Sequence, residues 1–160
     1  MRASPPRASL RVPTPGMLDV GERLIRGLWA GCLVTIGYLA APTLFATLDD
    51  RAVAGLLAGR MFTAGTFVSL AAAAMLAALY LGGGPRRSAR LWLALAVAGL
   101  LIGNEWGLRP LMDGARLPDG SPGENFARLH GVSALVWFAA SVLAVILAAL
   151  GPRPISRPAG

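Results

Sequence analysis

The chain is poor in the residues on which most enzymes and soluble domains rely. Lysine is absent, cysteine and histidine occur once each, and only 14% of the 160 residues are charged. The single cysteine, Cys32, excludes an intramolecular disulfide and, inside an apolar run, behaves as a small hydrophobic residue. So few charges, combined with 55% hydrophobic residues, exclude an ordinary soluble domain. The composition is that of a membrane protein.

The hydrophobic residues are gathered into four long stretches, which are residues 27–48, 62–82, 91–108 and 131–150. A helix of about 20 residues rises about 30 Å, which matches the hydrocarbon thickness of a bilayer. We therefore predict an all-α fold, an integral membrane bundle of four transmembrane helices that occupies residues 21–151. The short connections leave no room for a separate soluble catalytic module.

The segments outside these stretches have the composition of tails and loops. Residues 1–20 contain several prolines and arginines and predict a disordered basic tail, and residues 152–160 predict a flexible C-terminal tail. Apolar and polar positions are mixed in residues 49–61, which favours a short helix lying at the membrane interface. Residues 109–130 are rich in proline and glycine, which favours an ordered loop.

The placement of arginine predicts the orientation of the bundle. Ten arginines fall in the N-terminal segment, the second connection and the C-terminal tail, against five in the first and third connections. Because positively charged residues favour the cytoplasmic side, we predict that both termini lie in the cytoplasm. The arginines flank apolar stretches instead of lining one polar face, so we expect no nucleic-acid partner.

Small residues recur at every fourth position and predict where helices touch. Gly65 begins such a series in the second stretch, Gly99 and Gly103 belong to one in the third, and Gly31 to a shorter one in the first. This spacing lets helices approach closely in lipid, within one chain or between chains. The alternative is that glycine is simply common, since the chain has 20. Pro42 predicts a kink in the first helix, because proline lacks the backbone N–H.

A candidate polar or ligand site lies on the predicted outer side and consists of Asn104, Glu105, Arg109, His130 and Ser133. Glu105 is the only acidic residue within the four stretches, and Arg109 follows it at the i+4 spacing that lets opposite charges pair. This pair either anchors the end of the third helix or marks an ion or proton site. Asn104 has the chemistry to form a hydrogen bond to another helix.

His130 stands alone at the predicted start of the fourth helix. A single histidine more often anchors a helix by hydrogen bonding than binds a metal, because a metal site needs several ligands. We therefore predict no metal site and no cofactor, and the residues that could contribute to a metal site are His130 and Met112. Neither a Ser/His/Asp arrangement nor an HExxH motif is present, so we do not expect an enzyme.

Several short motifs occur in a fixed order at the ends of the stretches. They are LWAG at 28–31, APTLF at 41–45, AG at 54–55, RMF at 60–62, Asn104 with Arg109 and Pro110, and FARLHGVS at 126–133. Together these motifs resemble the transmembrane protein 205-like family, catalogued in bacteria as domain of unknown function 4149, over residues 22–150. The resemblance implies a small four-helix integral membrane protein, and the bacterial family has no settled activity. Glu105 does not match the family pattern.

Two functions are compatible with these features. The first is a structural or accessory membrane subunit that contacts the lipid bilayer and associates with its own copies or with other membrane proteins. The alternative is a small-solute or metal-ion transport or resistance protein that uses the outward-facing polar site. The first is favoured because the sequence holds no catalytic or metal-binding motif.

Overall fold

The computed structural model describes residues 16–81, 89–117 and 121–150. Four long helices account for most of these residues, and two of them each consist of three consecutive segments. In chain order the segments are α1 (Met17–Val34), η1 (Thr35–Ala40), α2 (Ala41–Thr47), α3 (Arg51–Leu81), α4 (Ala89–Ile102), η2 (Gly103–Leu108), α5 (Arg109–Gly114) and α6 (Phe126–Ala149). The predicted all-α fold is confirmed.

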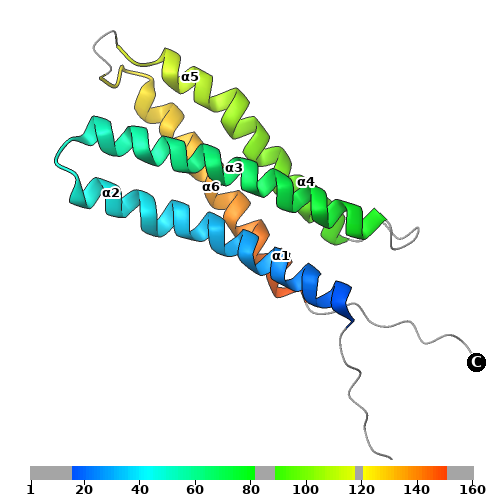
Figure 1. Cartoon of the computed structure of the whole chain (residues 1–160). Helices are drawn as coiled ribbons and strands as arrows, with labels where there is room; N and C mark the ends of the chain where they lie inside the picture. Colours follow the sequence, from blue (N-terminus) through cyan, green and yellow to red (C-terminus); the bar gives the residue numbers. More distant parts are fainter. Residues whose placement is uncertain (1–15, 82–88, 118–120, 151–160) are drawn as a thin grey trace, which may run out of the picture.

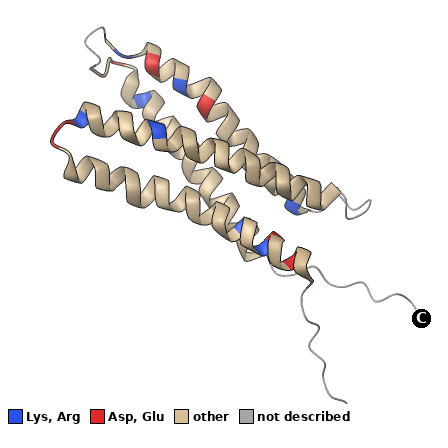
Figure 2. Cartoon of the chain, viewed as in Figure 1, with Lys and Arg blue, Asp and Glu red and all other residues tan. Residues whose placement is uncertain are grey.

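Successive long helices run in opposite directions and form one elongated bundle (Figure 1). The start of α1, the end of α3, the start of α4 and the end of α6 lie at one end, and α2, α5 and the start of α6 lie at the other. All four helices, of 24 to 31 residues, are long and apolar enough to cross a membrane, and their charged residues lie toward the two ends (Figure 2). The chain is therefore a multi-pass membrane protein whose outer surface contacts lipid.

Residues 49–61 do not form the separate interfacial helix predicted for them. Most of them are the first turns of α3, which begins directly after Asp50. The Asp50 side chain caps this helix, because its Oδ1 accepts hydrogen bonds from the backbone N–H groups of Ala52 at 2.8 Å and Val53 at 3.1 Å. Ala54 is fully buried, and no proline follows it in the helix. The segment is therefore helical but continuous with α3, and its larger apolar side chains, Val53, Leu56 and Leu57, are exposed.

Helices also extend into two segments predicted to be non-helical. The predicted tail of residues 1–20 contains the start of α1 at Met17, since no proline follows Pro15 there. In the predicted loop of residues 109–130, α5 occupies the beginning and α6 the end, with a bridge between Arg116 and Pro122 in the part between them. The predicted C-terminal tail lies outside the described residues.

The first and third long helices share one irregularity. In each, a six-residue π-helix, η1 or η2, is followed at the second position by a proline, Pro42 or Pro110. Proline has no N–H to donate, and its ring crowds the carbonyl group one turn earlier. A π-helical turn is wider than an α-helical turn and accommodates this local misfit. Both helices therefore continue past their prolines.

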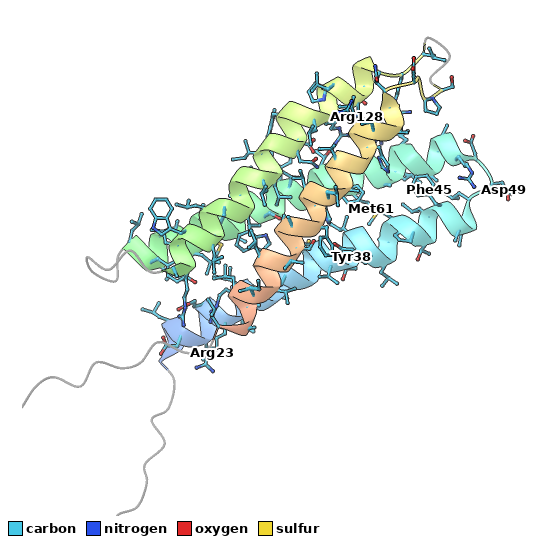
Figure 3. All side chains as sticks on the ribbon, turned by 180° about the vertical axis from the view of Figure 1, so that it is seen from behind. Arg23, Tyr38, Phe45, Asp49, Met61 and Arg128 are labelled. Carbon is cyan, nitrogen blue, oxygen red and sulfur yellow. The ribbon has the colours of Figure 1, made fainter. Side chains whose placement is uncertain are left out.

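Side chains occupy the space between the ribbons (Figure 3). Trp137 of α6 is one of the buried residues of this core. Its Nε1 donates a hydrogen bond to the Leu33 carbonyl oxygen at 3.2 Å. A Cβ on Gly37 would lie 2.6 Å from this nitrogen, and one on Gly65 would lie 3.2 Å from the Trp137 ring and 2.7 Å from Ile36 Cδ1. Gly37 thus leaves no room for a Cβ beside the rigid Trp137 ring, and Gly65 permits the close approach of three helices. Gly65 lies at a helix contact within the chain.

Gly31, Gly99 and Gly103 do not lie at contacts between helices of the same chain. All three are exposed, and a Cβ built on any of them would have no neighbour within 4 Å. The third helix instead packs through a different face, formed by larger side chains that bury more apolar area, namely Leu91, Ala94, Val97, Ala98 and Leu101. Of the two alternatives, packing within one chain is not seen for these glycines among the described residues, and packing between chains stays a prediction.

Candidate functional site

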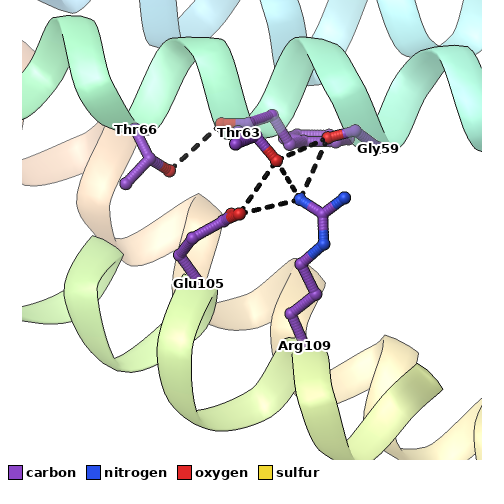
Figure 4. A network of polar contacts seen from close by, with 6 residues as sticks. Gly59, Thr63, Thr66, Glu105 and Arg109 are labelled. Atoms are coloured by element: carbon purple, nitrogen blue, oxygen red, sulfur yellow. Dashed lines mark hydrogen bonds and ion pairs between the residues drawn. The ribbon is translucent and has the colours of Figure 1, made fainter.

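Glu105 and Arg109 form the centre of a polar network near the end of the bundle that holds α2 and α5. Arg109 Nη1 lies 2.9 Å from Glu105 Oε1, and the hydroxyl of Thr63 donates to the same carboxylate oxygen at 2.9 Å (Figure 4). Arg109 also donates to the carbonyl oxygen of Gly59 at 3.2 Å and to the Thr63 hydroxyl. We call these four residues the Glu105 cluster. It joins the third long helix to α3.

The Glu105 cluster is electrically balanced and partly open. One carboxylate faces one guanidinium, and the Arg109 side chain is 32% exposed against 12% for Glu105. Each charged group is engaged by a partner on its own helix and by Thr63 or Gly59 on α3. The structure thus forms the ion pair that the i+4 spacing favours. Its contacts are those of an interhelical anchor.

The other predicted site residues are not joined to Glu105. His130 is exposed, and its ring stacks on Phe126 at a centroid distance of 5.9 Å. Ser133 is half-buried. Asn104 is buried, and its Oδ1 has no hydrogen-bond partner among the described residues. In the described part of the chain, no hydrogen bond or ion pair links these three residues to one another or to Glu105.

No group of three or more His, Cys, Asp and Glu side chains in the described ranges could hold a metal ion. Met112 is half-buried at the end of α5. Its thioether and the single imidazole of His130 would be two ligands at most, whereas protein metal sites use three or four. The described residues therefore offer no metal centre at this end.

A second polar network lies at the opposite end of the bundle, and sequence reasoning did not predict it as a site. The Glu22 carboxylate accepts hydrogen bonds from Tyr80 Oη and from Arg90 Nη1, both at 3.1 Å, and lies 3.7 Å from Arg26 Nε. Glu22 and Arg26 are only 6% and 3% exposed. We call these four residues the Glu22 cluster. They come from α1, α3 and α4.

Arg26 extends this network to the fourth long helix. Its Nη1 donates to the carbonyl oxygens of Leu147 and Leu150, each at 2.9 Å. These carbonyl groups belong to the C-terminal end of α6, where a cation also interacts favourably with the helix dipole. Through Glu22 and Arg26, all four long helices are held together at this end. The signal in the sequence is the i+4 spacing of Glu22 and Arg26, the same as that of Glu105 and Arg109.

The fold and these two clusters define a class, a small multi-pass membrane protein whose helices are tied together by ion pairs near the ends of the bundle. Residues 24–117 match the family described as domain of unknown function (DUF4149). The match covers more than half of the chain, so the protein belongs to this family. No curated protein and no solved structure matches the chain.

The matched segment is shorter than the 22–150 over which the motifs resemble the family. It includes the Glu105 cluster and three members of the Glu22 cluster, but ends before α6 and begins after Glu22. The FARLHGVS motif at 126–133 therefore lies outside the matched segment.

Proposed function

We propose that this protein is a non-enzymatic accessory subunit of a bacterial inner membrane, which packs against other membrane helices through the outer face of its third long helix. One observation carries the proposal. Gly99, Gly103 and Gly107 follow one another at every fourth position, are exposed, and have open space where a Cβ would stand. Small residues at this spacing let another helix approach closely in lipid. Exposed apolar side chains beside them would enlarge such a contact, among them Leu95, Ile102 and Trp106.

The interior supports a structural role over transport. The described core is filled by apolar side chains from all four helices, led by Trp29, Leu33 and Trp137. The buried hydroxyls of Ser69 and Ser141 donate to carbonyl groups of their own helices at 2.6 and 2.9 Å. A transport path needs polar groups that are free to meet a solute. The hydroxyl groups of Ser69 and Ser141 already form hydrogen bonds within their own helices and are not free to bind a solute.

The test of the accessory role uses two glycines that have equally open surroundings. Gly103→Ile blocks the proposed face, whereas Gly131→Ile places the same side chain on α6, where a Cβ also has no neighbour within 4 Å. We expect in-cell cross-linking at native expression to give a complex that Gly103→Ile abolishes and Gly131→Ile preserves. Mass spectrometry of the complex separates a second copy of the chain from another membrane protein. Detection of the monomer alone in the unsubstituted chain would contradict the proposal.

The orientation is part of the same proposal and rests on the arginine count of ten against five. Both termini are then cytoplasmic, and the connection between α5 and α6 is outside. A reporter domain that is active only in the periplasm should be active when it is fused at residue 120. Activity of a cytoplasm-dependent reporter at that position would reverse the orientation.

Transport remains the alternative function, and the observation that favours it is the unpartnered Asn104 Oδ1 next to Glu105. A buried acceptor of this kind is able to meet a passing cation or solute donor. Under this alternative, Glu105→Ala and His130→Ala would change the metal content and metal sensitivity of cells. Unchanged values in both variants would exclude a metal-handling role.

A further inference from the structure

The third long helix repeats the first. In both helices a six-residue π-helix is followed at the second position by a proline, and Pro110 comes 68 residues after Pro42. At the same shift, identical residues stand just before each π-helix, namely Ala30 and Ala98, Gly31 and Gly99, and Leu33 and Leu101. The two members of each pair also share their environment, since the alanines and leucines are buried and the glycines are exposed.

α6 repeats α3 in the same way, at a shift of 71 residues. The sequence LAAL occurs at 76–79 and again at 147–150, and Phe67 and Phe138 are both more than half exposed. The buried residues of the two helices also correspond, namely Thr66 and Trp137, Ser69 and Ala140, Ala73 and Ala144, and Leu76 and Leu147. Residues 17–81 and 89–150 therefore follow one common pattern of two helices, and we call them the first and the second repeat.

The two repeats are arranged as related halves of the bundle. α1 and α4 each pack on both α3 and α6, and corresponding helices run in the same direction because successive helices alternate (Figure 1). This is the geometry of parallel repeats related by an axis along the membrane normal. In many transporters built in this way, the repeats move against each other as nearly rigid bodies. The contacts between the repeats therefore decide whether they are able to move.

Contacts between the repeats differ at the two ends of the bundle. At one end, Glu22 of the first repeat accepts a hydrogen bond from Arg90 of the second, and Arg26 donates to carbonyl groups at the end of α6. These residues are nearly inaccessible or mostly buried. Near the other end, the Glu105 cluster joins the second repeat to α3 of the first.

The Glu105 cluster breaks the symmetry of the repeats. Glu105 stands where the first repeat has Gly37, and a Cβ on Gly37 would lie 2.6 Å from the Trp137 ring. One contact between the repeats is thus filled by a rigid aromatic ring, whereas the other is an ion pair whose Arg109 side chain is 32% exposed. Beside this pair, Asn104 is buried and its Oδ1 has no partner among the described residues, which destabilises the closed arrangement.

The first and third long helices bury fewer residues in their second halves than in their first halves. α1 and α4 bury five residues each, whereas η1, α2, η2 and α5 together bury only Ala41 and Asn104. Segments with few buried contacts open at a low cost in free energy. The end of the bundle that holds α2 and α5 is therefore the end at which the repeats separate most easily.

We propose that the two repeats tilt against each other about the Glu22 cluster, and that the Glu105 cluster is the releasable contact that keeps the opposite end closed. In the closed arrangement, α3 of the first repeat holds the ion pair of the second. When these bonds break, water hydrates the separated carboxylate and guanidinium groups, while the Glu22 cluster still holds all four long helices. This motion does not depend on the glycine face of the third helix, so opening and partner binding are tested separately.

The test measures distances across both ends of the full chain by pulsed electron paramagnetic resonance in lipid nanodiscs. One pair of spin labels replaces Thr47 and Ala127, across the end that holds the Glu105 cluster. The other pair replaces Leu24 and Ala149, across the Glu22 end, and all four positions are exposed. Both proteins also carry Cys32→Ser, so that only the introduced cysteines are labelled.

Thr63→Val removes the hydroxyl that joins the repeats and keeps the shape of the side chain. We expect it to widen the distance at the Glu105 end by more than about 2 Å, the size of a domain rearrangement, and to leave the distance at the Glu22 end unchanged. Thr66→Val is the matched control and should change neither distance. Thr66 lies one turn further along the same helix and donates to the Phe62 carbonyl oxygen of that helix (Figure 4).

Glu105→Gln is a second variant that removes the ion pair with Arg109 and should widen the same distance. Unchanged distances in both variants would overturn the proposal, even if their unfolding temperatures fell, because the Glu105 cluster would then be an anchor only. Equal widening at both ends would also overturn it, because the repeats would then not tilt about the Glu22 cluster.

Discussion

The Glu22 and Glu105 clusters contain the same local motif and use it differently. Each is built on a glutamate followed four residues later by an arginine. Glu22 and Arg26 are nearly inaccessible and form hydrogen bonds to three other helices. Glu105 and Arg109 are partly exposed, and their hydrogen bonds to other helices in the described part of the chain go to α3. The i+4 spacing therefore allows the ion pair to form. The packing of the other helices around the pair determines how much it contributes to the stability of the fold.

This difference has an energetic consequence. Removal of one partner from a buried ion pair leaves an uncompensated charge and typically costs about 3–5 kcal/mol. An accessible pair is solvated by water and salt, and its loss typically costs about 0–1 kcal/mol. We therefore expect the Glu22 end to determine the stability of the bundle and the Glu105 end to contribute little.

The largest effect is expected from Arg26→Ala. The substitution removes an ion partner of Glu22 and the donor to the carbonyl groups of Leu147 and Leu150. The free energy of unfolding should fall by about 3–5 kcal/mol, measured by SDS titration in mixed micelles with circular dichroism. Arg23→Ala is the matched control, because Arg23 is exposed and points away from the bundle (Figure 3), and it should change the value by less than about 0.5 kcal/mol. Equal effects of the two substitutions would show that Arg26 is solvated in the folded protein.

A smaller effect at the same end is expected from Tyr80→Phe. The ring stays in the core, and only the hydroxyl that donates to Glu22 is removed. Hydrogen bonds to charged groups contribute about 1.5–3 kcal/mol, so the same titration should show a loss in that range. Tyr38→Phe serves as the control, since Tyr38 is 48% exposed. If both substitutions are neutral, the Glu22 carboxylate does not depend on Tyr80.

The sequence predicted the four helices well, because four long apolar stretches have few other solutions in a membrane protein. It placed the beginning of the first helix too late, since a charged segment before an apolar stretch looks like a membrane edge. Glu22 and Arg26 are charged residues that the folded protein buries. They become buried when Tyr80, Arg90 and the end of α6 pack against them. Such contacts join residues far apart in the sequence, so no local pattern predicts them.

The glycines illustrate the same limit. Gly65 and Gly103 both belong to series of small residues at every fourth position, yet Gly65 is buried and Gly103 faces outward. The difference arises from Trp137, a large side chain of another helix that occupies the space beside Gly65. The spacing of small residues shows where another helix is able to approach closely. A large side chain on that helix, here Trp137, determines where the close contact forms. The π-helices before Pro42 and Pro110 likewise had no signal beyond the prolines themselves.

The smallest effect is expected from Arg109→Ala, which tests the other side of the comparison. Arg109 is partly exposed, and the Thr63 hydroxyl still donates to Glu105 after the substitution. The free energy of unfolding should fall by about 1 kcal/mol or less. Because salt screens accessible charges, this difference should shrink between low and high salt, whereas the difference for Arg26→Ala should stay nearly constant. A loss as large as that of Arg26→Ala, and equally insensitive to salt, would show that the fold depends on the Glu105 pair as strongly as on the Glu22 pair, and would contradict the comparison.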